Sequence, residues 1–119
     1  MATMTGQEIV DSARGKLNEL NESEYRDEWK DDKMLKWVNE AVLFVRSNRP
    51  DSQYSSAGVL SDDSNITDLA SAVSIDSKWL APAYHYVVGS ALECHSGETF
   101  NAEKSKQMFQ KAVDLLGSI

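Results

Sequence analysis

The strongest constraint on the fold is the spacing of apolar residues between positions 34 and 45. Apolar side chains recur there every three or four residues, which places them along one face of an α-helix. Trp37 and Phe44 lie seven residues apart on a neighbouring face. A helix that is apolar on more than one side is buried on two sides, so we expect this one to contact both a core and another surface. The main stripe comprises Met34, Leu35, Val38, Ala41, Val42 and Val45.

The ends of this helix are also marked in the sequence. We expect it to begin at Asp31 or Asp32, because carboxylates are favoured at the positive N-terminal end of a helix. Pro50 pushes the residue before it out of helical geometry and therefore predicts the end. Arg46 and Arg49 lie in the predicted last turn, where positive charge suits the negative end of the helix.

A second helix is predicted to begin at Thr5, which can form a capping box with Glu8. A third is predicted from Leu80 to His95, with Asp76 as its cap and Pro82 in its first turn, where proline is tolerated. Gly89 is small and predicts a close approach of another helix. The inward residues of these two helices are Ile9, Val10, Ala13, Leu17 and Leu20, then Leu80, Tyr84, Val87, Val88, Ala91 and Leu92.

The last predicted helix runs from Asn101 to Leu116 and is closed by Gly117. Residues 51–75 are rich in Ser and Asp, and we expect them to form an exposed arm with little core, with extended pieces at 57–60 and 66–73. The fold class is therefore all-α: a small four-helix bundle in one domain, residues 1–119. The inward residues of the last helix are Ala102, Met108, Phe109, Ala112, Val113 and Leu116.

Composition narrows the function. The net charge is -7, from 19 acidic and 12 basic residues, which argues against nucleic-acid binding through a basic surface. No apolar run reaches the roughly 18 residues that span a bilayer, and the first residues do not resemble a signal peptide. We therefore expect no membrane partner and synthesis in the cytoplasm. Cys94 is the one cysteine, so no internal disulfide is predicted.

No pattern in the sequence points to a catalytic or cofactor site. His85 and His95 lie ten residues apart on one predicted helix without further ligands at metal-binding spacing. Cys94 adjoins His95, but adjacent helical residues do not face one another, so Cys94 is predicted to be a small apolar or interface residue. No phosphate-binding glycine loop is present. We expect no cofactor, no metal and no enzymatic activity.

Three segments together carry a more specific pattern. The first has Trp29 before the helix that contains Trp37-Val38-Asn39-Glu40-Ala41 and ends at Arg49-Pro50. The second has Trp79 followed by a Tyr86-Val87 pair, and the third runs from Asn101 and Lys104 to Leu115-Leu116-Gly117. This combination resembles the head-to-tail adaptor (connector) proteins of tailed bacteriophages over most of residues 5–117, with a gap at 52–65. Lys30 stands where the family has a Ser or Thr cap, so capping is expected to shift to Asp31.

The resemblance implies a virion protein at the head-to-tail neck. Such proteins form a ring, commonly dodecameric, below the portal protein; the ring extends the DNA channel and docks the next neck or tail protein. Double-stranded DNA would pass through without specific binding, which an acidic chain suits. We expect the subunit contacts to involve the helices around positions 37 and 86. The interface candidates are Trp29, Trp37, Phe44, Arg46, Arg49, Tyr54, Trp79, Tyr84 and Tyr86.

A different class of function remains open from the residues alone, namely a soluble helical binding or regulatory module without a ring. The feature that separates the two is the helix around position 40. A lone monomer is not expected to keep Trp37, Phe44 and Val45 all buried.

Overall fold

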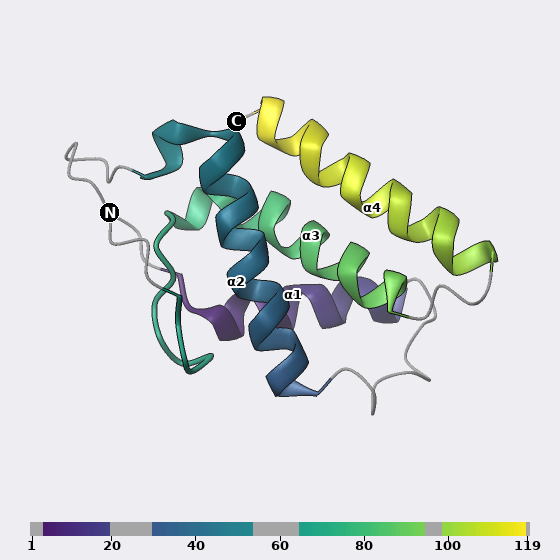
Figure 1. Cartoon of the computed structure of the whole chain (residues 1–119), viewed down its shortest axis with the longest axis horizontal. Helices are drawn as coiled ribbons and strands as arrows, with labels where there is room; N and C mark the ends of the chain where they lie inside the picture. The colour runs from purple at the N-terminus through teal and green to yellow at the C-terminus, as the bar shows by residue number, and fades with distance from the viewer. Residues whose placement is uncertain (1–3, 20–29, 54–64, 95–98, 119) are drawn as a thin grey trace.

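The computed structural model describes residues 4–19, 30–53, 65–94 and 99–118. Its helices are α1 (Gly6–Glu19), α2 (Asp31–Asn48), α3 (Leu80–Glu93) and α4 (Thr99–Ser118), with short 3₁₀ helices η2 (Pro50–Gln53) and η3 (Ser77–Trp79). Within those ranges there is no strand, only an isolated antiparallel bridge between Thr5 and Ala72. The all-α prediction is confirmed, and Figure 1 shows how the four helices are arranged.

Helix α3 is the centre of the bundle and packs against each of the other three helices (Figure 1). Its start at Leu80 and the position of Pro82 in its first turn follow the prediction. The predicted cap does not: the Asp76 carboxylate accepts a hydrogen bond from the Lys78 N–H at 3.0 Å and caps η3, while Trp79 at the N-cap of α3 makes no side-chain cap hydrogen bond. The helix is buried on nearly every side because its own chain covers it, so its apolar residues do not require a neighbouring subunit. The buried residues are Pro82, Ala83, His85, Val87, Val88, Gly89, Ser90, Ala91 and Leu92.

The close helix approach predicted from Gly89 occurs between α3 and α4. A Cβ atom at position 89 would lie 2.9 Å from the Phe109 ring, closer than real Cβ contacts allow. The Ser105 hydroxyl donates a hydrogen bond to the Gly89 carbonyl at 2.8 Å across the same contact. The missing side chain of Gly89 therefore lets α4 sit directly on α3.

Two predictions about α4 are wrong. Val113 was expected to face inward but is 50% exposed, and Gly117 lies inside the helix instead of closing it. The exposure of Val113 has a simple cause, since α4 packs chiefly on α3 and buries only a narrow stripe that includes Ser105, Ala112 and Leu116.

The N-terminal capping box is confirmed. The Thr5 hydroxyl accepts a hydrogen bond from the Glu8 N–H at 3.2 Å, and the Glu8 carboxylate accepts one from the Thr5 N–H at 3.3 Å. The apolar face of α1 then enters the core through Ile9, Val10, Ala13 and Leu17. Leu20 lies outside the described residues.

The capping predicted for α2 is wrong. Lys30 occupies the N-cap position and makes no side-chain cap hydrogen bond, while Asp31 lies within the first helical turn. The Asp31 carboxylate instead accepts a hydrogen bond from Arg14 on α1 at 2.8 Å. An exposed ion pair of this kind contributes about 0–1 kcal/mol to stability. The sequence showed the carboxylate but not the arginine that α1 brings beside it.

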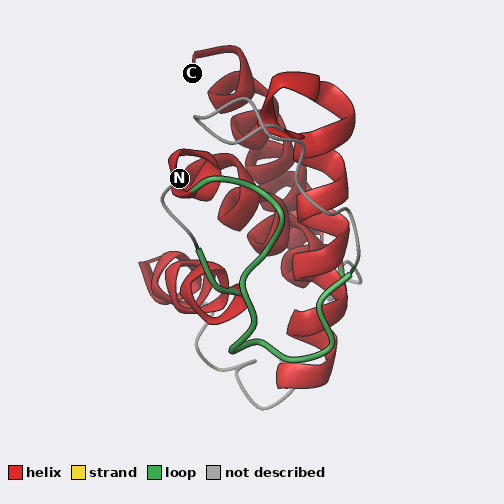
Figure 2. Ribbon diagram, turned by 90° about the vertical axis from the view of Figure 1, so that its left-hand side faces the viewer, coloured by secondary structure: helices red, strands yellow, loops and turns green. Residues whose placement is uncertain are grey.

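The expectation of an exposed arm does not hold for residues 65–75. Leu69, Val73 and Ile75 are buried in the core. The segment, green in Figure 2, runs beside the start of α1, where the Gln7 N–H donates to the Leu69 carbonyl at 2.8 Å. Residues 66–73 form bends and a turn instead of an extended piece, and the piece expected at 57–60 lies outside the described residues.

Candidate functional site

Three of the predicted interface residues contact other parts of their own chain: Arg46, Arg49 and Trp79. Trp79 is fully buried, and the Arg49 guanidinium lies over its ring at 4.9 Å from the centroid. Arg49 also pairs with the Asp51 carboxylate at 2.9 Å and donates a hydrogen bond to the Leu116 carbonyl of α4. Arg46 is 7% exposed and donates to the Ser74 carbonyl at 3.3 Å. These groups hold the C-terminal end of α2 to its own chain.

Three other interface candidates lie close together in the structure, and a fourth, Tyr84, is described separately. Trp37, Phe44 and Tyr86 lie at the junction of α2 and α3, where Phe44 stacks on Tyr86 with ring centroids 4.9 Å apart. Tyr84 is half-buried beside His85, with ring centroids 4.2 Å apart. Trp29 and Tyr54 lie outside the described residues.

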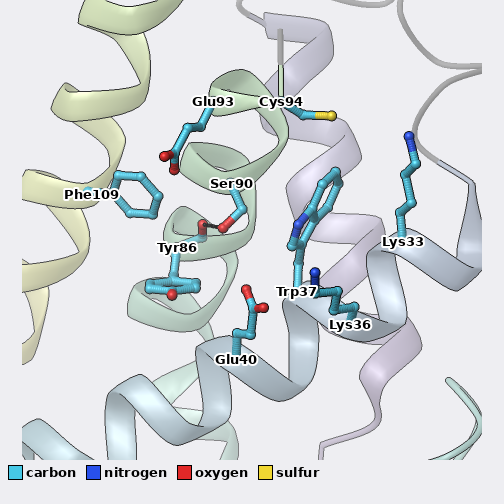
Figure 3. A pocket seen from close by; sticks show the side chains of 9 residues that line it. All are labelled: Lys33, Lys36, Trp37, Glu40, Tyr86, Ser90, Glu93, Cys94 and Phe109. Atoms are coloured by element: carbon cyan, nitrogen blue, oxygen red, sulfur yellow. Dashed lines mark hydrogen bonds between the residues drawn. The ribbon is translucent and has the colours of Figure 1, made fainter. Parts of the chain in front are cut away.

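The junction opens into a groove of about 410 Å³ between α2 and α4, with α3 as its floor (Figure 3). The two walls meet where Arg49 contacts Leu116, and Figure 1 shows α2 and α4 diverging from that end. The α2 wall consists of Lys33, Lys36, Trp37 and Glu40. The floor and the α4 wall consist of Tyr86, Ser90, Glu93, Cys94 and Phe109. We call this surface the aromatic groove.

Aromatic rings link the three helices that form the groove. Tyr86 is the central ring: Phe44 of α2 stacks on one side, and Phe109 of α4 meets it edge to face with centroids 5.3 Å apart. Such pairs stabilise by about 0.5–1.5 kcal/mol beyond the area that they bury. All three rings remain partly exposed, so they form part of the core and part of the surface.

Charged groups line the groove around these rings. Burial raises the pKa of the Tyr86 phenol, and the negative charges of Glu40 and Glu93 raise it further. Lys33 and Lys36 supply positive charge on the α2 wall. The groove therefore has aromatic side chains on its floor and charged groups of both signs at its rim.

Sequence reasoning missed two exposed apolar residues near this site. Val113 follows Phe109 by four residues on α4, so it continues the same flank of that helix beyond the groove. Leu43 is 64% exposed and lies on α2 opposite the buried stripe. Leu43 lies between Val42, a residue of the predicted stripe, and Phe44. The helical period alone would have placed Leu43 on the outer face of α2.

Among the described residues, the histidine is His85 and the cysteine is Cys94. His85 is buried, and because a carbonyl can only accept, its Nδ1–H donates to the Ala81 carbonyl at 2.7 Å. Burial lowers the pKa of His85, with smaller lowering from Lys16 and Lys111. No group of three His, Cys, Asp or Glu side chains in the described parts of the chain is arranged to hold a metal ion. Cys94 is exposed at the groove, not apolar core, and His95 lies outside those parts.

Comparison with known proteins gives no relative. No family model, curated protein or solved structure matches the chain. No helix in the ranges that the structure describes is both long and apolar enough to cross a membrane. The function is therefore inferred from the surfaces and motifs of this chain itself.

Proposed function

We propose that this protein is a structural assembly subunit, the head-to-tail adaptor of a tailed bacteriophage. In this role, copies of the chain form a ring below the portal protein, extend the DNA channel and dock the next neck or tail protein. The proposed location is the neck of the virion.

The aromatic groove is the observation that carries the assembly part of the proposal. Trp37, Tyr86 and Phe109 line a hollow on the surface, between α2 and α4 and above α3. An apolar hollow with a charged rim is typical of a site that another protein covers. A small-molecule site would instead enclose its ligand and hold convergent polar groups.

The family part of the proposal rests on the sequence resemblance. Those of its residues that the structure describes fall on or beside α2, α3 and α4, where several of them make contacts between elements. The Asn39 side chain donates to the Ile66 carbonyl and accepts from the Ile66 N–H, both at 3.0 Å. Arg49 covers Trp79, and Tyr86 joins Phe44 to Phe109. These contacts give the motif residues a physical reason to occur together.

The net charge of -7 supports a conduit for DNA more than a DNA-binding surface. A negative wall does not neutralise phosphates, so a duplex can slide past it without being held. In this proposal, double-stranded DNA is a passing cargo and makes no specific contact.

One observation favours a second function, a helical binding module that forms no ring. A single chain buries Trp37 and Val45 and packs Phe44 against Tyr86. The feature expected to require a neighbouring subunit is therefore largely satisfied within one molecule, and the groove alone would then bind a different protein.

The mass of the purified protein separates the two functions. We expect light scattering to give many times the 13.2 kDa of one chain, either for the protein alone or after mixing with portal protein. A mass of one chain in both conditions would reject the ring and favour the binding module.

A further inference from the structure

We propose that the aromatic groove receives an arginine side chain of another protein, with the guanidinium group held between aromatic rings and carboxylates. This inference rests on the proposed role in assembly and adds to it the chemistry of the partner's anchoring residue. It follows from the arrangement of the groove lining and from a contact of the same kind elsewhere in the chain.

The centre of the groove has rings on two sides and carboxylates at two ends (Figure 3). Trp37 of α2 and Phe109 of α4 stand on opposite sides of the α3 floor, while Glu93 lies toward the top of the view and Glu40 toward the bottom. The face of an aromatic ring carries partial negative charge, so rings and carboxylates both attract a cation. The middle of the groove therefore suits a flat positive group.

The charges that act on Tyr86, the ring on the floor, are negative. Burial raises the pKa of the Tyr86 phenol most, and Glu40 and Glu93 raise it further. Two lysines also line the groove, Lys33 and Lys36, and both stand on the α2 wall. Among the described residues, no ion pair joins either lysine to Glu40 or Glu93, so both carboxylates are available to a partner.

The chain already holds one guanidinium group in this manner. Arg49 lies over the Trp79 ring at 4.9 Å from its centroid and pairs with the Asp51 carboxylate at 2.9 Å. The groove presents the same two elements, an indole ring and carboxylates, on the surface of the molecule. The Arg49 contact is therefore a precedent, within the same fold, for the contact that we propose.

A guanidinium group fits this lining better than an ammonium group does. Its planar face stacks on an aromatic ring while its N–H edge forms paired hydrogen bonds with a carboxylate. An ammonium group is a compact and more strongly hydrated charge. Arginine therefore uses the rings and the carboxylates of the groove at the same time.

The arginine is assigned to another protein because the described arginines of this chain are engaged within it. Arg14 pairs with Asp31 at 2.8 Å, and the buried Arg46 donates to a backbone carbonyl. Arg49 covers Trp79. In the proposed function, the portal protein and the next neck or tail protein are the partners that would supply the anchor.

The test measures how fast Cys94 is alkylated in dilute protein, since this exposed thiol lies in the groove lining. The probes are three blocked tripeptides whose middle residue is arginine, lysine or citrulline, which has nearly the shape of arginine but no charge. The variant E40Q/E93Q removes both carboxylate charges. The matched control E103Q/D114N removes two exposed charges of α4 outside the groove lining. Circular dichroism establishes that each variant keeps its helices.

We expect the arginine peptide to slow the alkylation in a saturable way, the lysine peptide to act more weakly and the citrulline peptide to have no effect. E40Q/E93Q should raise the dissociation constant of the arginine peptide by about tenfold or more, because the hydrogen bonds lose their charge. E103Q/D114N should leave it unchanged. Equal protection by the citrulline or lysine peptide, or full protection of E40Q/E93Q, would overturn the arginine site.

Light scattering separates this inference from the proposed function. Mixed with portal protein, E40Q/E93Q should form less of the large assembly than E103Q/D114N does. If E40Q/E93Q instead loses only the assembly that the protein forms alone, the arginine belongs to a second copy and the assignment to another protein is wrong. If the unmodified protein stays at 13.2 kDa with portal protein while the arginine peptide still protects Cys94, the proposed function fails and the arginine site stands.

Discussion

The two ends of α2 show how differently one helix can be used. At its C-terminal end, Arg46 and Arg49 reach carbonyl groups of residues 65–75 and α4, and Trp79 is completely buried beneath Arg49. Along its N-terminal half, Lys33, Lys36 and Trp37 instead line an open groove. We call these the closed end and the open end of α2.

The difference teaches that apolar residues on a second face of a helix do not by themselves identify an interface. Trp79 and Trp37 are both large aromatic residues. Trp79 is completely buried, whereas Trp37 lines the groove. What separates them is the next layer of the fold. Residues 65–75 and the end of α4 cover the closed end, whereas α4 diverges from α2 at the open end (Figure 1).

The largest expected effect comes from breaking the closed end. Trp79→Ala should lower the free energy of unfolding by about 3–5 kcal/mol, because it removes a fully buried aromatic side chain and leaves a cavity. Val113→Ala, at the open side, should change it by no more than about 0.5 kcal/mol. Urea denaturation of dilute protein measures both.

Trp79→Phe refines this comparison. The indole Nε1 of Trp79 has no hydrogen-bond partner among the residues that the structure describes, so the phenyl ring should recover most of the stability that alanine loses. Equal effects of Trp79→Ala and Val113→Ala would contradict the division of α2 into a closed and an open end.

The next effect concerns the contact that forms the α4 wall of the groove. Gly89→Ala should destabilise by about 1–3 kcal/mol, because the new Cβ would lie 2.9 Å from the Phe109 ring and push α4 away from α3. Gly15→Ala on α1 is the matched control, since nothing lies within 4 Å of its added Cβ. That control should stabilise by about 0.5–1 kcal/mol through helix propensity. A stabilising Gly89→Ala would show that α4 does not pack closely at Gly89.

The smallest effect is a pH dependence from His85. Burial lowers the pKa of His85 in the folded state, so the unfolded chain binds this proton more readily. Its contribution to stability is full above the ordinary pKa of 6.5 and is lost as the pH falls below it toward the folded-state pKa. Asp51, whose pKa Arg49 lowers by hydrogen bonding, loses its contribution only below the ordinary carboxyl pKa of 3.8.

His85→Gln should therefore flatten the decline in stability just below pH 6.5 and leave the loss at more acidic pH unchanged. Urea denaturation at a series of pH values provides the measurement. An unchanged slope in the variant would mean that another group binds the proton.

Much of the fold was predictable from local patterns. The capping box at Thr5 and the close approach at Gly89 depend on neighbouring residues or on one missing side chain, and each was found as expected. The pairing of Asp31 with Arg14, in place of the predicted cap, and the burial of Leu69 were not foreseen. Both depend on residues of α1, which the chain brings close only after folding.

The site was predictable only in part for the same reason. Helical spacing selected Trp37, Phe44 and Tyr86, which do lie together. It could not foresee the contacts that Arg46, Arg49 and Trp79 make within the chain, because their partners are distant carbonyl groups and a cation over a ring. The exposure of Val113 depends on α4 having one main neighbour, which no sequence period encodes.

The reactivity of Cys94 tests most directly whether the open end is an assembly surface. Cys94 is the one cysteine in the chain, is exposed and lines the groove, so its rate of alkylation reports whether the groove is covered. The account predicts fast alkylation of Cys94 in dilute, monomeric protein and strong protection of the same thiol in the assembled protein. Equal rates in the monomer and the assembly would mean that the groove stays open, and would contradict the account.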